Sequence, residues 1–173
     1  MATGRTLKRW TRFVFKGADA TMREIPIDGI TGVTTNFQTV DLTAWQDPAH
    51  GFLPDIPIVQ IKITGPFDTT AAVGMAASTA APTLSGSHTI LAALYNLAPP
   101  QATGPLNLSL AVCYGIRGYY TTGDPAFGLA TATATSGFWV SNYTPDPGTG
   151  KYSATFDLYP GSVLPTWINT LPS

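Results

Sequence analysis

The chain of 173 residues is poor in charge, because Asp, Glu, Lys and Arg together make up only 11% of it. That share is less than half of what soluble proteins usually carry. A surface with so little charge favours association, and it suits a subunit of a permanent assembly better than a free monomer. A secreted β-domain with a polar, threonine-rich surface is the alternative that composition leaves open.

Cysteine and histidine are almost absent, with Cys113, His50 and His88 as the three examples. A single cysteine excludes an internal disulfide, and without a disulfide framework we expect synthesis in the cytosol. A zinc site needs three or four ligands, and no spacing of these residues supplies them. We therefore expect no metal, no cofactor and no catalytic residues, and we predict that the protein is not an enzyme.

Four carboxylates follow one another closely in the sequence, at Asp41, Asp47, Asp55 and Asp68. Calcium needs six to eight oxygen ligands, and the D-x-D-x-D-G pattern of a calcium loop does not occur. We expect these side chains to accept hydrogen bonds in turns and caps.

Long apolar runs are also missing, since Gly, Pro, Ser and Thr interrupt every hydrophobic stretch. The basic N-terminal segment is not followed by the apolar run of a signal peptide. No stretch has the length and hydrophobicity of a transmembrane helix. We therefore expect no signal peptide and no membrane partner.

The few charges are unevenly distributed along the chain. From Glu24 onward, nine acidic residues accompany three basic ones. The first 23 positions hold six of the nine basic residues: Arg5, Lys8, Arg9, Arg12, Lys16 and Arg23. Apolar residues are interleaved with them, which favours an edge strand with basic side chains over a nucleic-acid-binding tail. A third hypothesis is that this basic arm meets the acidic body of a neighbouring subunit.

What the sequence does contain is mostly the alternation of β-strands. A period of two predicts strands at 7–15, 21–27, 31–40, 56–65, 106–114, 128–143 and 152–158. Asp28–Gly29 and Thr144–Gly150 carry turn signals. We expect Pro160–Ser173 to be irregular, with Trp167 as an anchor.

One helix is expected at residues 85–97, capped by Ser85 or Ser87. Its apolar face is formed by Ile90, Leu91, Leu94 and Leu97. Residues 70–81 are a weaker helix candidate, because Gly74 lowers their helix propensity. The whole chain, 1–173, is predicted to be one mainly-β domain: a β-sandwich or partly closed barrel with one flanking helix and extended loop or arm segments. Residues 1–16 would form a basic N-terminal arm or edge strand.

The stretch from Thr39 to Asp68 organises the rest of the chain. It begins with Asp41, Leu42, Thr43, Trp45 and Asp47, continues with Leu53–Pro54, and closes a strand with Gly65, Phe67 and Asp68. In this order it resembles the tail tube proteins of long-tailed bacteriophages, which often carry a D-V-T-x-F-x-D-like segment, a leucine-proline loop and a strand ending in G-x-F-D. The resemblance is closest over these thirty residues, and the proline-rich stretches 97–105 and 144–165 have no counterpart in it.

The resemblance implies a virion structural protein, made in the host cytoplasm and located in the tail. Subunits of that family form six-membered rings that stack into a hollow tube. Genomic DNA passes through the lumen without specific binding, and an acidic excess after residue 23 suits such a lumen. The implied partners are further copies of the chain and other tail proteins: the tail tip, the terminator and the tape measure.

The same resemblance implies that the N-terminal arm, 1–15, and the loop at 41–55 make contacts between subunits. The residues expected there are Arg5, Lys8, Arg9, Trp10, Arg12, Asp41, Thr43, Trp45, Asp47, His50, Phe52, Leu53 and Asp55. Two other functions stay open. One is a capsid decoration or cement protein. The other is a carbohydrate-binding β-domain, which would use Tyr114, Tyr119, Tyr120, Phe138, Trp139 and Tyr143.

Overall fold

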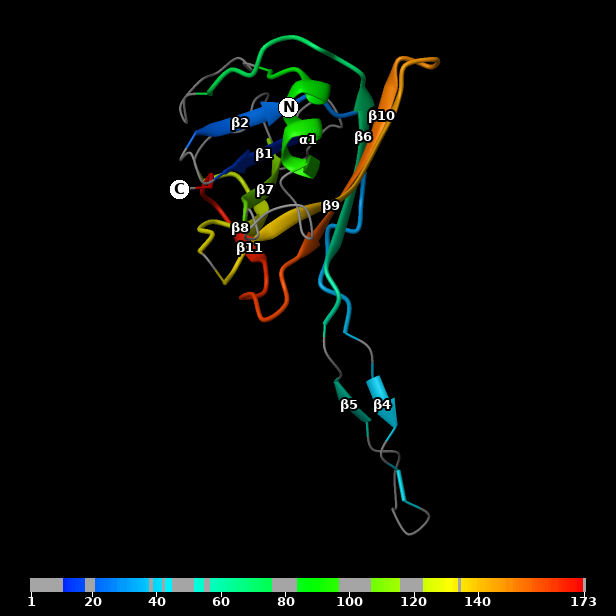
Figure 1. Ribbon diagram of the computed structural model, residues 1–173. Helices are drawn as coiled ribbons and strands as arrows, with labels where there is room; N and C mark the ends of the chain where they lie inside the picture. Colours follow the sequence, from blue (N-terminus) through cyan, green and yellow to red (C-terminus); the bar gives the residue numbers. More distant parts are fainter. Residues whose placement is uncertain are drawn as a thin grey trace, which may run out of the picture.

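Two antiparallel sheets pack face to face, with one helix beside them and a two-stranded arm that extends away (Figure 1). The computed structural model describes residues 11–17, 21–37, 39–41, 43–44, 52–54, 57–75, 84–96, 107–115, 123–133 and 135–172, and of residues 52–54 the backbone alone. The predicted mainly-β sandwich with a flanking helix is confirmed, and the sheets do not close into a barrel.

Sheet A has the strand order β11-β8-β7-β1-β2. Its strands are β1 (Thr11–Lys16), β2 (Met22–Ile25), β7 (Ser109–Tyr114), β8 (Ala126–Leu129) and β11 (Thr166–Ile168). Since β1 pairs with β7 on one side and β2 on the other, the expectation of an edge strand near the N-terminus is wrong. The C-terminal segment is not wholly irregular either, because β11 forms the opposite edge of this sheet.

Sheet B has the strand order β3-β6-β10-β9. Its strands are β3 (Gly29–Thr31), β6 (Gln60–Pro66), β9 (Phe138–Asp146) and β10 (Lys151–Leu158). The predicted hairpin between the last two is present, with β9 continuing through Asp146 before the turn. Leu108 and Phe138 exchange two backbone hydrogen bonds of 2.7 and 2.9 Å, which join the sheets at one corner.

The main core lies between the sheets and follows the alternation of the sequence. Phe13 and Phe15 of β1 face Ile61 and Ile63 of β6, and all four side chains are buried. The rings of Phe13 and Phe156 lie 4.9 Å apart, a distance typical of a tilted aromatic pair. Apolar side chains at every second position therefore hold the two layers together.

The other face of sheet A is covered as well, which the sequence did not suggest. A second, smaller cluster there contains Val14, Met75, Ala111, Cys113 and Ala126. Strand β7 is consequently buried on both faces, although its alternation predicts one polar face. Met75 belongs to this cover. Residues 70–75 form no helix, so the helix candidate at 70–81 is wrong over this part, and residues 76–81 lie outside the described chain.

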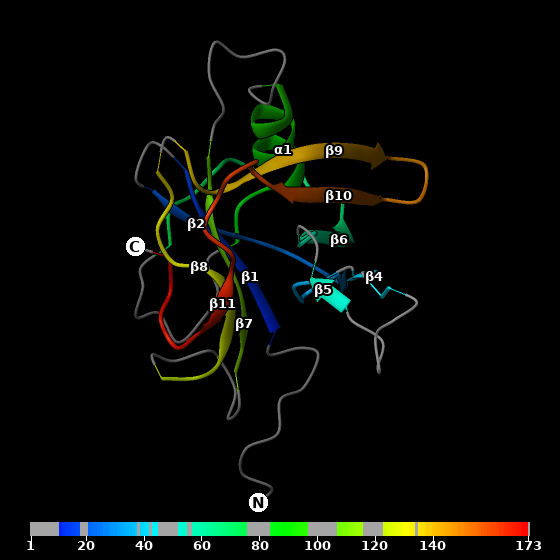
Figure 2. The same cartoon turned by 90° about the horizontal axis from the view of Figure 1, so that it is seen from below.

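The helix α1 (Ser87–Asn96) packs against β9, and both views show it beside that strand (Figure 2). Ile90 and Leu91 are buried, as the predicted apolar face requires. The expected serine caps are not formed. Ser85 Oγ donates to the Val73 carbonyl at 2.7 Å and Ser87 Oγ to the Pro66 carbonyl at 2.7 Å, so both serines fasten the helix to the preceding segment.

Candidate assembly interface

The predicted strand at 31–40 is divided, and its two pieces belong to one long hairpin. Gly29 pairs with Thr64 in sheet B, and ten residues further along Thr39 pairs with Pro54. The register is therefore the same at both ends, with a one-residue offset where Asn36 pairs with Ile58. Gly32, with φ of 77°, interrupts the strand because its backbone lies against the Gln60 carbonyl.

The outer end of this hairpin, β4 (Thr39–Asp41) with β5 (Phe52–Pro54), is called the arm from here on. It lies well away from both sheets (Figure 1). Asp41 follows Asn36 by five residues, or roughly 17 Å at the rise of a β-strand. Along the approach to the arm and on it, Phe37 is 56% exposed, Val40 45% and Ile58 53%. Exposed apolar side chains on an isolated hairpin need a partner surface, since two strands alone are marginally stable.

The carboxylate of Asp41 organises the chain at the end of β4. Asp41 Oδ1 accepts hydrogen bonds from the Thr43 backbone nitrogen at 2.9 Å and from its hydroxyl at 2.5 Å. These bonds hold the pKa of the Asp41 carboxyl below its usual value. Asp68 makes the same kind of turn with the Thr70 nitrogen at 2.9 Å. The predicted turn role is thus confirmed for these two carboxylates.

Several residues expected at subunit contacts lie outside the described residues: Arg5, Lys8, Arg9, Trp10, Trp45, Asp47, His50 and Asp55. Phe52 and Leu53 are placed by their backbone, opposite Asp41 and Val40 in the arm. The structure therefore brings Asp41, Thr43, Phe52 and Leu53 together at the arm. Their contact role stays a prediction.

Arg12, which was expected at a subunit contact, is buried inside the subunit instead. It is 4% exposed, and its Nε and Nη2 donate to the two carboxylate oxygens of Glu24 at 2.9 and 2.6 Å. This bidentate pair sits beneath the cover of sheet A, where Met75 Sδ lies 3.8 Å from Nη2. Its guanidinium is thus held inside the subunit.

The face of sheet B that points away from the core is polar and nearly balanced in charge. Cross-strand pairs on it include Thr64 with Ser153 and Thr155 with Asn142. Lys151 forms an exposed ion pair with Asp28 at 2.8 Å. Lys62 and Lys151 are two of the three basic residues after Glu24, so the acidic excess of the sequence is not concentrated on this face.

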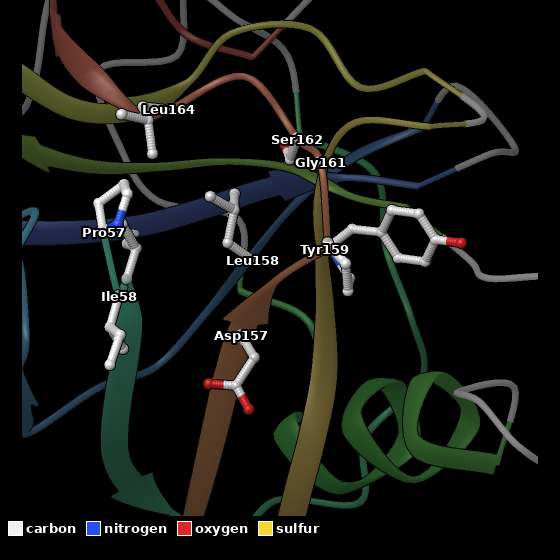
Figure 3. A pocket seen from close by; sticks show the side chains of 10 residues that line it. Pro57, Ile58, Asp157, Leu158, Tyr159, Gly161, Ser162 and Leu164 are labelled. Atoms are coloured by element: carbon white, nitrogen blue, oxygen red, sulfur yellow. The ribbon is translucent and has the colours of Figure 1, made fainter. Parts of the chain in front are cut away.

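A pocket of about 530 Å³ lies where the hairpin leaves the body, between the start of β6 and residues 159–164. Its walls are mostly apolar, with Pro57, Ile58, Leu158 and Leu164 prominent, and the Tyr159 ring points away from Pro57 (Figure 3). Asp157, at its border, accepts a hydrogen bond from Gln60 at 2.8 Å. This lining contains no nucleophile paired with a base.

Among the described residues, the cysteine and the histidine lie apart from each other. Cys113 is fully buried, and this burial raises the pKa of its thiol to about 12. His88 Nδ1 and the Tyr143 hydroxyl are 2.8 Å apart between α1 and β9. In the part of the chain that the structure describes, no group of three or more His, Cys, Asp or Glu could hold a metal ion.

Two of the described aromatic residues considered for sugar binding are turned toward the core rather than toward an open surface. Phe138 is fully buried in the main core, and Tyr143 is half-buried against it. Tyr119 and Tyr120 lie outside the described residues. An exposed aromatic that sequence reasoning treated only as an anchor, Trp167, is found instead at the edge of sheet A.

One finding bears on membranes: within the described ranges, no helix combines the length and the hydrophobicity that a bilayer crossing requires.

No protein-family profile matches the chain, and no curated protein sequence does. Among solved structures, the anti-feeding prophage cap, described as a tube-terminating cap, matches 98% of this chain and 95% of its own, with a TM-score of 0.53 and 11% identity. The sheath–tube complex of an extracellular contractile injection system has a TM-score of 0.47 and 9% identity, covering 92% and 89% of the two chains. A sheath/tube terminator of such a system has the same score and identity, covering 91% and 93%. The likeness to the prophage cap shows a shared fold along almost the entire chain.

Proposed function

We propose that this protein is a structural subunit of the tail tube of a phage-like particle, which acts by assembly and not by catalysis. Copies of the chain form six-membered rings, and the rings stack into a hollow tube through which DNA passes. Further partners are the tail tip, the terminator and the tape measure. The particle tail is its location after synthesis in the host cytoplasm.

The arm is the observation that carries this proposal. It is built from the stretch that resembles tail tube proteins, Thr39–Asp68, and it leaves the body as an isolated hairpin. Phe37 and Val40 are exposed there without a covering layer within the described chain. A neighbouring subunit is the surface that would bury them, and that burial would contribute about 25 cal/mol per Å² of apolar area.

The polar face of sheet B supports the role of this sheet as the lining of the lumen. Hydroxyl and amide side chains dominate it, and the charge of Lys151 on it is neutralised by Asp28. Its described cations are Lys62 and Lys151, the second of which is paired with Asp28, so phosphate contacts and their salt-dependent attraction stay weak. Strands β3 and β9 at its two edges are placed to continue the sheet into neighbouring subunits.

A second candidate is a tube-terminating cap. It is favoured by one observation, the full-length fold likeness to the anti-feeding prophage cap. A cap would form a ring but would not stack on copies of itself. The two candidates therefore differ in whether the purified chain extends into tubes.

A substitution in the arm tests the proposal, since only assembly depends on the arm. Val40→Glu places a charge on its exposed apolar surface and should reduce stacking by roughly tenfold or more, because a buried unpaired charge is costly. Sedimentation velocity measures the assembled fraction. The matched control is Ala93→Glu on the exposed side of α1, which should assemble like the unmodified chain.

Both variants should unfold at the same temperature as the unmodified protein, since Val40 and Ala93 are outside the core. If Val40→Glu assembles normally while folded, the arm does not make the subunit contact. That result would remove the main support for the proposal that the protein is a tail tube subunit.

A further inference from the structure

The exposed large apolar side chains of the described residues fall into three groups. One is the arm and its approach, treated above. The other two lie at opposite edges of sheet A: Val163 and Trp167 near β11, and Val73 and Leu84 beyond β2. Three strands separate β11 from β2, so the two edges are roughly 19 Å apart at the usual strand spacing. Figure 1 shows the two edge strands on opposite sides of the sheet.

The β11 edge presents a fixed tryptophan. Trp167 is 64% exposed, yet its ring lies 5.9 Å from that of Tyr114 and 5.5 Å from that of Phe127. The ring is therefore held in place before any partner arrives, which lowers the entropy cost of binding. Tryptophans that become fully desolvated on binding are typical anchors of protein interfaces.

The β11 edge carries no charge, although it is a short strand of three residues that directly follows Pro165. No Asp, Glu, Lys or Arg follows Asp157 in the sequence. Edge strands normally carry such residues to prevent association. Among the described residues, no strand pairs with the outer side of β11.

The β2 edge ends in a small apolar surface that is equally well fixed. The nitrogens of Met75 and Ser85 donate to the carbonyls of Met22 and Glu24 at 2.9 and 2.8 Å. Ser85 Oγ then bonds both the nitrogen and the carbonyl of Val73, at 3.0 and 2.7 Å. Val73 and Leu84 are thus presented side by side on a backbone tied to β2.

This second surface is also poor in charge, with Arg23 as the cation of its strand. No Asp, Glu, Lys or Arg occurs between Asp68 and Arg117. Glu24 is neutralised by Arg12 beneath the surface. Arg23, the cation of β2, is half-buried and compatible with the contact, because a guanidinium packs favourably on an indole face.

We propose that the β11 edge of one copy packs against the β2 edge of the next, with Trp167 covering Val73 and Leu84. The occupant of each surface is a second copy of the chain, since the β11 edge carries no ion and its indole suits the Arg23 guanidinium and the apolar side chains of the β2 edge. Two different patches on one molecule make a head-to-tail contact, which closes into a ring when the rotation allows it. Only the closure of this contact into a ring rests on the proposed tube function; the contact itself does not.

Site-specific crosslinking tests the contact directly. Leu84→Cys and Trp167→Cys are made as separate single variants, and the buried native Cys113 is retained. With a short bismaleimide crosslinker, neither variant alone should form covalent dimers, whereas their equimolar mixture should. The double variant should give a ladder of higher oligomers on a denaturing gel.

The matched control is a mixture of Leu84→Cys with Ser153→Cys, whose exposed side chain lies on sheet B. It should give no dimer. Dimers from Trp167→Cys alone would show a symmetric tryptophan contact and overturn the head-to-tail arrangement. Equal yields in the test and control mixtures would show random collision and overturn the proposal.

Trp167→Glu supplies a second readout that does not need a crosslink. We expect association to weaken by roughly tenfold or more, with the circular dichroism spectrum unchanged because Trp167 is mostly exposed. Normal association of the folded variant would contradict the contact.

The two proposals can fail separately. Tubes without the 84–167 crosslink would leave the tube function standing and remove the edge contact. Crosslinked head-to-tail oligomers that never form a ring or tube would leave the edge contact standing and remove the tube function.

Discussion

At the scale of the residue, the N-terminal basic segment shows that charge alone is a poor guide to whether a side chain is exposed. Its pattern suggested basic side chains on an exposed strand face, yet Arg12 is buried and paired with Glu24. The error has a physical source, because the sequence does not reveal that Met75 packs over this face of sheet A. A carboxylate twelve positions away was the available signal, and many such pairs occur by chance.

Removing one partner of this buried pair should cost about 3–5 kcal/mol of folding stability, because the other charge stays buried and uncompensated. Glu24→Gln and Arg12→Met are the single variants, and chemical denaturation measures the loss. The double variant, Arg12→Met with Glu24→Leu, should recover most of it. Lys151→Met, which breaks the exposed pair with Asp28, is the control and should change stability by less than about 1 kcal/mol.

Glu24→Leu is also made as a single variant. If the double variant is as unstable as the sum of Arg12→Met and Glu24→Leu, the two side chains are not coupled. The ion pair would then not be the reason for the burial of Arg12.

At the scale of the element, alternation located most strands of the body and failed at 128–143, on the hairpin and at the chain end. The range 128–143 was predicted as one strand, but it belongs to β8 and β9, which lie in different sheets. β6 and β10 were predicted because their apolar side chains alternate toward a buried core. The strand at 31–40 was predicted as one piece, but Gly32 divides it and its outer part leaves the body. Strand β11 was missed because a strand of three residues is too short for a period to appear.

The docking of α1 depends on a close approach between the backbones of Gly86 and Thr70. A Cβ on Gly86 would overlap the Thr70 backbone, including its carbonyl oxygen. His88 and Thr89 bond the same segment, through the Asp68 carbonyl at 2.8 Å and the Thr70 carbonyl at 2.9 Å. The start of the helix is therefore positioned by residues 68–70.

Gly86→Ala should destabilise the fold by about 1–3 kcal/mol, the usual cost of overpacking against atoms that cannot yield. Thermal unfolding followed by circular dichroism measures the change. Gly148→Ala in the β9–β10 turn is the control, because its Cβ would meet only the flexible carboxylate of Asp146. An equal effect of both substitutions would show that the loss of glycine flexibility, not the contact with Thr70, sets the cost.

At the scale of the whole molecule, the body, the arm and the two charge-poor edges of sheet A all suit a subunit of an assembly. The sequence located the arm through the stretch Thr39–Asp68, and composition pointed to association. It did not reveal which surfaces meet, because Trp167 and Leu84 are far apart in sequence and become the two ends of one sheet only in the fold. Contacts between copies depend on that arrangement and leave no periodic pattern.

Electron microscopy of the purified chain over a range of concentration and salt tests the central claim most directly. The proposed function predicts six-fold rings that stack into hollow tubes, alone or once tail-tip components are added to start assembly. A chain that stays monomeric at high concentration even with those components would contradict it.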